Sequence, residues 1–538
     1  MNDPRPWRSD LPGPDPEAVP VTEFLLEHAS RFGDKPALID GPTGRAVTYR
    51  QLADGVGRVA AALAARGFGK GDVLALSSPN LPEYALAMYG AMAAGGVVTG
   101  ANPLLTAGEL AGQLADAGAS VLVTVPPFLE TARVAADRAG VAEVLVFGEA
   151  EGVTPFASLL ATEDAPPKVR IDPAGDLAAL PYSSGTTGLA KGVELTNANL
   201  VAQARQTQAV MGVTTDDVVV GMAPFFHAIG QSIILPTSLR AGATVVTMPR
   251  FDLAGFLGLI QEYRATFSIV VPPVVLALAG HPMVDDYDLS SLRLLGCGAA
   301  PLGADVEQRC ADRLGCPVTQ GFGMTEASAA LAIVPPDAPR PGSAGRLLPG
   351  TEARIVDPAG GGDLGPGRTG ELWARGPQVM RGYRNRPEAT AATLVPGGWL
   401  RTGDLCYVDA DGYLFVVDRL KELIKYKGIQ VAPAELEALL CAHPAVADAA
   451  VVPRPDPEAG EVPVAHVATR SEVSAAELEA WVADRVAPYK RLRGVRFVDQ
   501  VPRSPTGKLL RRVLVEAERA DTGRADTGRA EAEPAGVA

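Results

Sequence analysis

The amino-acid sequence predicts an α/β protein with substantially parallel sheets, followed by a small β-rich layer and a separate α+β domain. Three observations indicate this. Buried-strand patterns alternate with helical periods up to Gly296, Gly/Pro turns then separate short extended segments, and a new helix-and-strand pattern starts after Asp418. A chain of 538 residues is also too long for a single hydrophobic core and is expected to divide into domains.

The first half of the chain carries the alternation. Helices are expected at residues 21–29, 52–66 and 84–93, where apolar residues recur at helical spacing. Short apolar runs predict buried strands at 73–76, 121–125, 144–147, 218–222, 244–248, 267–271 and 292–295. Such alternation is typical of parallel sheets, in which ligands bind at the carboxyl ends of the strands.

Beyond Gly296 the pattern changes twice. Extended segments at 349–356, 370–375 and 413–417 are separated by turns such as 358–362, which predicts an antiparallel layer. After Asp418, a helix from Pro433 and a strand at 445–452 predict a new domain. We therefore expect a flexible lead at 1–20, a large domain at 21–417, a small domain at 418–515 and a low-complexity, disordered tail at 516–538.

Composition excludes several functions. A net charge of -14 argues against nucleic acid or an anionic membrane as the main partner, because either would require a basic face. The five cysteines are scattered without a Cys-x-x-Cys pair, which predicts neither a zinc site nor a disulfide framework. The amino terminus lacks a signal-peptide pattern, and no apolar run is long enough to span a membrane. We expect a cytoplasmic protein with no nucleic-acid partner and no membrane span.

A Gly/Ser/Thr-rich stretch at residues 183–192 lies between two extended segments. Its hydroxyls and backbone N–H groups suit a loop that surrounds phosphate oxygens, with Lys191 as a point charge. It is not a Walker loop, because Leu189 and Ala190 separate Gly188 from the lysine. The alternative is a flexible surface turn, and this stretch alone does not decide between the two.

Two further motifs could bind parts of a nucleotide. In residues 320–326, Phe322 could cover an adenine face, Thr325 could bond a phosphate and Glu326 could hold Mg²⁺; the alternative is a tight turn with a buried Phe. In residues 399–404, the carboxylate of Asp404 is expected at a turn, where it would suit a pair of ribose hydroxyls. An N-cap is the commoner role of such an Asp.

Three more candidates lie elsewhere. The charged run 418–430 sits at the predicted domain boundary, where a cleft and a hinge coincide, although such a run is usually a solvated face. Lys508 ends the turn 505–508, and an exposed structural lysine is the alternative. His227 is surrounded by apolar residues and is more often a core residue than a general base in such a setting.

Together these stretches resemble, in order and spacing, the adenylate-forming superfamily of acyl-CoA synthetases, luciferases and adenylation domains, from about Phe24 to Arg512. The segments 418–428, 430–437, 370–372 and 375–376 are most similar to the 4-coumarate/cinnamate CoA ligases. The resemblance implies a large N-terminal AMP-binding domain of stacked mixed β-sheets with helices and a β-rich layer, and a small mobile α+β C-terminal domain. It favours the phosphate-binding interpretation of residues 183–192.

The resemblance also implies roles for residues in nucleotide binding. The phosphate loop would hold the β and γ phosphates through Ser183, Ser184, Gly185, Thr186, Thr187 and Lys191. Mg²⁺ would be bound by Glu326 and Thr187. The rest of the ATP site would comprise Ala299, Gln320, Gly321, Phe322, Thr325, Asp404, Arg419 and Lys421, with Asp404 and Arg419 at the ribose and Lys421 as the hinge.

The remaining implied roles concern catalysis, the acid and the coenzyme. Lys508 would bridge the attacking carboxylate and the α-phosphate, His227 would position the acyl group, and Lys425 and Gln430 would assist near the phosphate. The acid pocket would comprise His227, Ile229, Ala299, Gly321 and Ile333. Coenzyme A would meet Arg250, Lys427 and Gly428.

The implied reaction joins a small carboxylic acid to coenzyme A with ATP and Mg²⁺, through an acyl adenylate, in a monomer or homodimer. The acid would be of the cinnamate/4-coumarate type. Ile229 stands where the plant ligases carry a tyrosine, which leaves the pocket more apolar. This favours cinnamate, a substituted benzoate or cinnamate, or a medium-chain fatty acid over a 4-hydroxylated acid. A stand-alone adenylation enzyme that loads a carrier protein, and a non-enzymatic nucleotide-binding protein, are the competing hypotheses.

Overall fold

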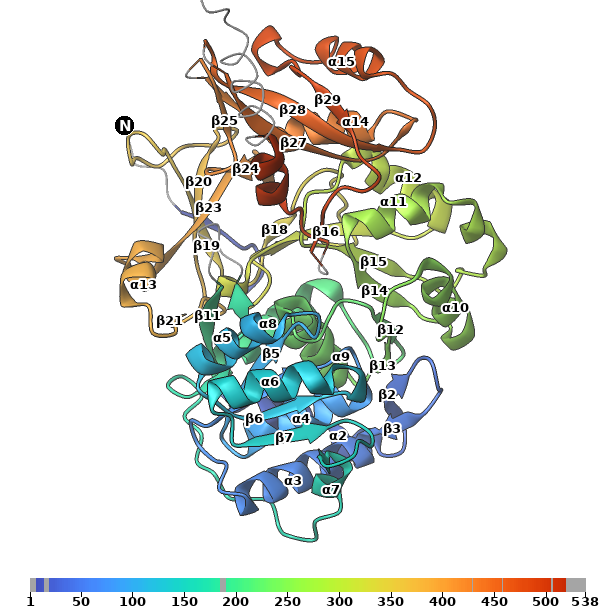
Figure 1. The fold of residues 1–538 in the computed structure, drawn as a ribbon, viewed down its shortest axis with the longest axis vertical. Helices are drawn as coiled ribbons and strands as arrows, with labels where there is room; N and C mark the ends of the chain where they lie inside the picture. Colours follow the sequence, from blue (N-terminus) through green and yellow to red (C-terminus); the bar gives the residue numbers. More distant parts are fainter. Residues whose placement is uncertain are drawn as a thin grey trace, which may run out of the picture.

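The computed structural model describes residues 6–13, 19–183, 190–427, 429–456, 458–504 and 507–518, with the side chain of Gln430 left out. Four predicted ATP-site residues (Ser184, Gly185, Thr186 and Thr187), Gly428, the Gln430 side chain and the tail at 519–538 therefore lie outside the described residues. Within them the chain forms two large sheets, a smaller antiparallel sheet and a C-terminal sheet (Figure 1).

The first large sheet is parallel in its centre. Its strands, in spatial order, are β18 (Arg346–Leu347), β17 (Ala332–Ile333), β16 (Val318–Phe322), β15 (Leu294–Cys297), β14 (Phe267–Val270), β12 (Val218–Gly221), β13 (Thr244–Thr247), β2 (Pro36–Asp40) and β3 (Ala46–Thr48). The run from β16 to β2 pairs in parallel throughout. Its strand ends therefore form one continuous carboxyl edge.

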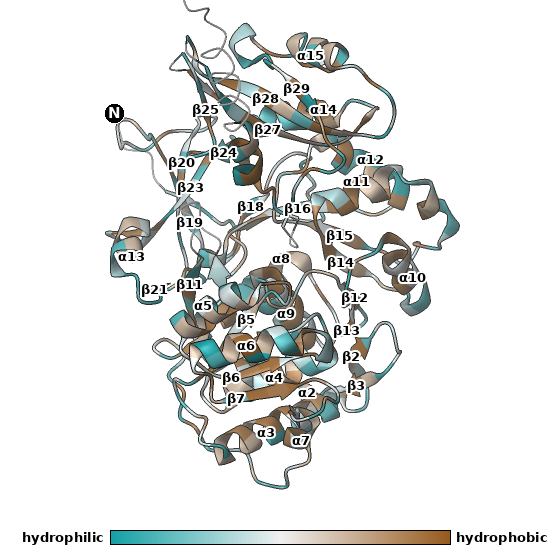
Figure 2. Cartoon of the chain, in the orientation of Figure 1, coloured by the Kyte–Doolittle hydropathy of each residue, from teal (hydrophilic) through white to brown (hydrophobic). Residues whose placement is uncertain are grey.

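The second large sheet mixes parallel and antiparallel pairs. Its order is β10 (Tyr182–Ser183), β11 (Lys191–Thr196), β9 (Leu177–Ala179), β5 (Val97–Ala101), β4 (Val73–Ser77), β6 (Ala119–Thr124), β7 (Glu143–Val146) and β8 (Thr154–Pro155), with β21 (Gly382–Tyr383) beside β11. Every residue of β4 and β5 is buried, as expected for strands covered on both faces. These strands form an apolar interior with helices packed over it (Figure 2).

The third sheet is antiparallel and carries the β-rich layer. It contains β1 (Trp7–Arg8), β19 (Glu352–Val356), β20 (Gly370–Arg375), β23 (Trp399–Val408) and β22 (Leu394–Val395), with β24 (Leu414–Arg419) paired to β23. The expectation of a flexible lead at residues 1–20 differs from the structure at Trp7 and Arg8. These two residues pair with β19, and Trp7 packs against the apolar core of this layer.

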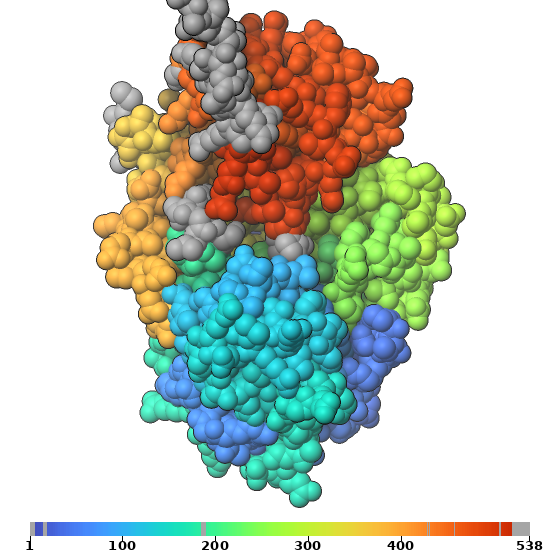
Figure 3. All heavy atoms as spheres, in the orientation of Figure 1, coloured from blue at the N-terminus to red at the C-terminus, as the bar shows by residue number. Residues whose placement is uncertain are grey.

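The C-terminal domain packs helices on one sheet. The sheet order is β26 (Ile429–Val431), β25 (Ile424–Tyr426), β28 (Gly460–Thr469) and β27 (Val446–Asp456), with β29 (Val495–Phe497) parallel to β28. Its helices α14 (Pro433–Cys441) and α15 (Ala475–Ala483) pack on this sheet, and residues 511–518 are also helical. In Figure 3 this part lies above the larger part of the chain and contacts it.

The α-helices begin and end where local chemistry allows. They are α1 (Val21–Leu26), α2 (Ala29–Phe32), α3 (Tyr49–Ala65), α4 (Pro82–Ala93), α5 (Ala107–Ala117), α6 (Leu129–Ala139), α7 (Ala157–Leu160), α8 (Asn197–Met211), α9 (Leu235–Ala241), α10 (Leu253–Tyr263), α11 (Pro272–Gly280), α12 (Ala304–Leu314) and α13 (Pro387–Thr393). Capping boxes at Thr48, Thr106 and Thr196 start α3, α5 and α8. Left-handed glycines end α5 and α8 at Gly118 and Gly212.

The predicted fold class is confirmed, with small shifts at element ends. The helix expected at residues 21–29 is divided into α1 and α2, because His28 leaves the helical conformation. The strand expected at 292–295 lies two residues later, as β15. The antiparallel layer and the helix from Pro433 are present as predicted.

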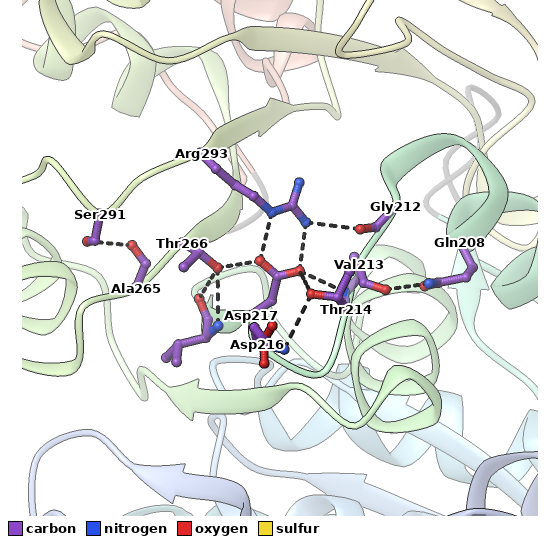
Figure 4. Close-up of polar contacts among 11 residues, drawn as sticks. Gln208, Gly212, Val213, Thr214, Asp216, Asp217, Ala265, Thr266, Ser291 and Arg293 are labelled. Atoms are coloured by element: carbon purple, nitrogen blue, oxygen red, sulfur yellow. Dashed lines mark hydrogen bonds and ion pairs between the residues drawn. The ribbon is translucent and has the colours of Figure 1, made fainter.

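An ion pair between the buried Asp217 and the exposed Arg293 ties together the amino ends of three strands in the first sheet (Figure 4). Asp217, just before β12, accepts hydrogen bonds from Arg293 Nε at 2.7 Å and from Thr266 Oγ1 at 2.6 Å. Thr266 precedes β14 and Arg293 precedes β15. The carboxyl edge of the same strands, at the opposite end, is therefore free of this network.

Candidate active site

Several of the predicted site residues follow parallel strands at the carboxyl edge of the first sheet. His227 comes after β12, Ala299 after β15 and Thr325 after β16. Because these strands run in parallel, the segments that follow them lie along one edge. Residues more than 90 positions apart in sequence are brought together in this way.

The turn that carries Lys508 approaches this edge from the C-terminal domain. A Cβ placed on Gly507 would lie 2.9 Å from the Cβ of Val271, which follows β14, and Gly507 has a φ of +75°. The Arg503 guanidinium holds the base of the turn through the Gly507 carbonyl at 2.9 Å and a two-point ion pair with Asp448. In Figure 1 this C-terminal segment descends toward β16.

Lys508 is partly buried among charges of both signs. Burial and the charge of Arg419 lower the pKa of its ammonium group, whereas the carboxylates of Glu422, Asp404 and Glu326 oppose that shift. The charge of Lys508 in turn adds to burial in lowering the pKa of His227 to about 4. His227 is therefore a neutral imidazole at physiological pH, suited to positioning a group rather than to carrying charge.

Asp404 and Arg419 are cross-strand partners in the antiparallel layer. Arg419 Nε donates to Asp404 Oδ1 at 3.0 Å, while Asp404 Oδ2 is buried without a partner among the described residues. The expectation that Asp404 lies at a turn is wrong, because it lies inside β23, which continues past Gly403 with its φ of +73°. Burial raises the pKa of Asp404 to about 6, although Arg419 and Lys508 oppose the rise.

Tyr383 connects two of the predicted phosphate-site residues. The Lys191 ammonium lies 4.2 Å from the centre of the Tyr383 ring, and the Tyr383 hydroxyl donates to Glu326 Oε1 at 2.8 Å. Glu326 is buried in a short 3-10 turn (Thr325–Ala327) and presents hard oxygen ligands. A single carboxylate of this kind fits Mg²⁺, which usually keeps waters and phosphate oxygens as its other ligands.

Two apolar contacts lie at the residues predicted for the acid pocket. A Cβ on Gly298 would lie 3.5 Å from Ile229 Cδ1, and one on Gly321 would lie 3.4 Å from Ile333 Cγ1. Gly321 and Ile333 are paired in the β16–β17 ladder. Ala299, next to Gly298, has a left-handed φ of 71°, so the loop after β15 turns sharply at this point.

The side chain of Gln320 supports the loop after β15 that carries Ala299. Its amide accepts from Leu302 N at 3.0 Å and donates to the Leu302 carbonyl at 3.1 Å. It also donates to Glu307 Oε2 at 2.5 Å. Its side chain therefore supports the Ala299 loop from behind. Glu307, which the sequence reasoning missed, is buried. Burial raises the pKa of its carboxyl group, although hydrogen bonds from Gly342 and Gln320 lower it.

Other predicted residues are not brought to this group. Lys425 and Lys427 lie exposed on the β25–β26 hairpin, and Figure 1 shows β25 well above the level of β16. Lys421 is exposed two residues after the end of β24, and Arg250 is exposed at the edge beyond β13. Two residues missed by sequence reasoning, Tyr383 and Glu307, are positioned by contacts between segments far apart in the chain. The one available signal for Glu307 was an acidic residue on α12 with no oppositely charged partner at helical spacing.

The family model for AMP-binding enzymes matches residues 25–384. The chain belongs to this family. The model for the AMP-binding enzyme C-terminal domain matches residues 435–508. Among curated relatives, a 4-coumarate–CoA ligase of Pinus taeda is 43% identical over 522 residues, covering 94% of this chain and 97% of that protein.

Solved structures agree with this membership. An anthranilate CoA ligase in complex with anthranoyl-AMP has a TM-score of 0.88 and 27% identity, covering 94% of this chain and 98% of that one. An amide bond synthetase from Marinactinospora thermotolerans has a TM-score of 0.83 and 30% identity, covering 92% of this chain and 99% of that one. No helix among the described residues has both the length and the apolar character needed to cross a membrane.

Proposed function

We propose that this AMP-binding enzyme is an ATP-dependent, AMP-forming ligase that joins a carboxylic acid to coenzyme A through an acyl adenylate. The observation that carries the proposal is the position of Lys508. A turn of the C-terminal domain holds it against the carboxyl edge of the first sheet, where Asp404, Glu326 and His227 also lie within reach of its charge. A cation there faces both the acid pocket and the nucleotide site.

In the first step, a carboxylate oxygen of the acid attacks the α-phosphorus of ATP, and the bond from that phosphorus to the pyrophosphate oxygen breaks. Lys508 would hold the two anions together, because their mutual repulsion costs about 1 kcal/mol per charge pair at 4 Å even in water. Asp404 Oδ2, buried without a partner among the described residues, would accept from a ribose hydroxyl. Glu326 would hold Mg²⁺, which when bound offsets phosphate charge.

In the second step, the sulfur of coenzyme A attacks the acyl carbon, AMP departs with the bonding electron pair, and the thiol loses its proton. We place the domain boundary near Asp418 and the hinge at Lys421, which is exposed two residues after the end of β24. Turning about Lys421 would exchange the Lys508 turn for the β25–β26 hairpin, bringing Lys425, Gln430, Lys427 and Gly428 to the site. Arg250 would meet a coenzyme phosphate.

The acid is proposed to be aromatic, of the cinnamate/4-coumarate type. Ile229 lies against Gly298 and Ile333 against Gly321, so apolar side chains line this part of the proposed pocket. The relative and the first structural neighbour are named for the aromatic acids 4-coumarate and anthranilate. Free thiols at all five cysteines support a cytoplasmic location, where the protein would act as a monomer or homodimer.

A panel of carboxylic acids with ATP, Mg²⁺ and coenzyme A alone tests the proposal. We expect aromatic acids to give a coenzyme A thioester, AMP and pyrophosphate in equal amounts, with cinnamate used better than medium-chain fatty acids because the relative and the first structural neighbour are named for aromatic acids. Adenylate without thioester would instead support loading of a carrier protein, and an octanoate preference would overturn the aromatic assignment.

A further inference from the structure

The carboxylate of Asp418 joins the antiparallel layer to the C-terminal domain. Asp418 is buried near the end of β24, opposite Leu405 of β23. Its Oδ1 accepts from Arg419 N at 2.6 Å, and its Oδ2 accepts from Ala434 N at 3.0 Å. The two backbone donors lie on opposite sides of the exposed Lys421 in the sequence, so this one side chain spans the proposed hinge.

The second donor belongs to the first turn of α14. That helix starts at Pro433 after an N-cap alanine, which has no side-chain acceptor to offer. The free N–H groups of a first turn need an acceptor, and a carboxylate also suits the positive end of the helix dipole. Asp418 therefore supplies, from another sheet, the cap that the α14 sequence lacks.

A second set of contacts continues from α14 to the Lys508 turn. Arg511 lies three residues after Lys508 and donates to Glu437 Oε2 of α14 at 2.9 Å. Arg511 also donates to Glu422 Oε2 at 2.6 Å and to the Val451 carbonyl at 2.7 Å. The position of α14 and the position of the Lys508 turn are thus linked through one buried guanidinium.

The charged form of the buried Asp418 carboxyl group is stabilised by its hydrogen-bond partners and a nearby arginine. Burial raises its pKa to about 6, while the hydrogen bond from Ala434, the charge of Arg511 and the hydrogen bond from Arg419 lower it and the charge of Glu422 raises it. At neutral pH the group is an anion whose charge is met by two backbone N–H groups and a nearby arginine.

We propose that Asp418 is a positioning residue for adenylate formation: by capping α14 across the hinge, its carboxylate holds the C-terminal domain in the orientation that presents Lys508. This inference rests on the proposed function. Turning of the C-terminal domain about Lys421 would carry α14 away from β24 and break the cap. The cap therefore supports the first step and contributes nothing to the second.

Two variants test the proposal by separating the half-reactions. For Asp418→Ala we expect acid-dependent pyrophosphate release without coenzyme A to slow by about 10- to 100-fold, the loss expected for a hydrogen-bonded charge. Thioester formation from supplied cinnamoyl adenylate should stay within about threefold of wild type. Asp418→Asn keeps the shape but can accept only one of the two N–H groups, so a smaller loss in the same direction is expected.

The matched control is Ser474→Ala, which removes the cap of α15 inside the C-terminal domain. It should leave the ratio of the two half-reaction rates unchanged. Equal losses in both half-reactions for Asp418→Asn, no loss in adenylation, or the same ratio change in Ser474→Ala would overturn the positioning role. Failure of wild type to form an adenylate or a thioester would overturn the proposed function itself, a separate outcome.

Discussion

Asp404 shows how burial and pairing combine at a single residue. Its Oδ1 is held by Arg419, while Oδ2 is enclosed without a partner among the described residues. An unsatisfied buried acceptor costs about 1–3 kcal/mol, which a hydroxyl of a bound ribose would recover. The unpaired oxygen therefore favours nucleotide binding over a purely structural role.

The raised pKa of Asp404, about 6, predicts a pH dependence of ATP binding. Below this pH the carboxyl is protonated and a poorer acceptor, so the KM for ATP should fall as pH rises from about 5 to about 7. Asp404→Asn should raise KM by about 10- to 100-fold near neutral pH and flatten the profile. The measurement is KM for ATP against pH in both proteins. An Asn variant that keeps the wild-type profile would assign the titration to another group.

Some residues of the candidate site could be predicted from a local sequence motif, and others could not. Lys508, Glu326 and Asp404 lie in motifs whose spacing could be recognised, although the turn expected at Asp404 is a strand because its cross-strand neighbours extend β23. Tyr383 gave no signal, since its contact with Lys191 depends on the pairing of β21 with β11. Gln320 could be recognised as a candidate site residue from its motif, but the support that its side chain gives to the Ala299 loop could not be predicted.

At the scale of elements, the parallel strands of the first sheet carry the candidate site. The strands β2 and β16 were not predicted, whereas the apolar runs of β12, β13, β14 and β15 made these four predictable from sequence, because strands buried on both faces need continuous apolar residues. Their order could not be predicted: β14 lies between β12 and β15, and β13 on the other side of β12. That order decides which following segments become neighbours at the carboxyl edge.

Asp217 is predicted to stabilise this sheet from its amino edge. Burial raises its pKa, but hydrogen bonds from Arg293, Thr266 and Thr214 outweigh this and hold the pKa below the usual value. The stabilisation is therefore present above the unfolded-state pKa and lost as pH falls through the folded one. Asp217→Ala should lower the free energy of unfolding by about 1–3 kcal/mol, measured by denaturant midpoint.

The control for this prediction is Asp288→Ala, which removes an exposed partner of Arg264. An exposed ion pair contributes little, so its midpoint should stay near that of wild type. Equal shifts in the two variants would contradict a special role for the buried Asp217 carboxylate shown in Figure 4.

At the scale of the whole molecule, the proposed site is complete only where two domains meet. The sheet edge would supply His227, the antiparallel layer Asp404, and the C-terminal domain Lys508. The division into a large and a small domain could be predicted from composition and pattern. The orientation that brings Gly507 against Val271 could not, because it depends on contacts such as that of Asp418 with Ala434 across the hinge.

The most direct test of the account compares the two half-reactions in Lys508→Ala, with Lys490→Ala as a control lysine of the same domain. Removing a cation that offsets charge in the transition state should slow acyl adenylate formation by about 100- to 1000-fold. Thioester formation from supplied acyl adenylate should change by only a few-fold, and Lys490→Ala should resemble wild type in both. Equal losses in both half-reactions of Lys508→Ala, or undiminished adenylate formation, would contradict the account.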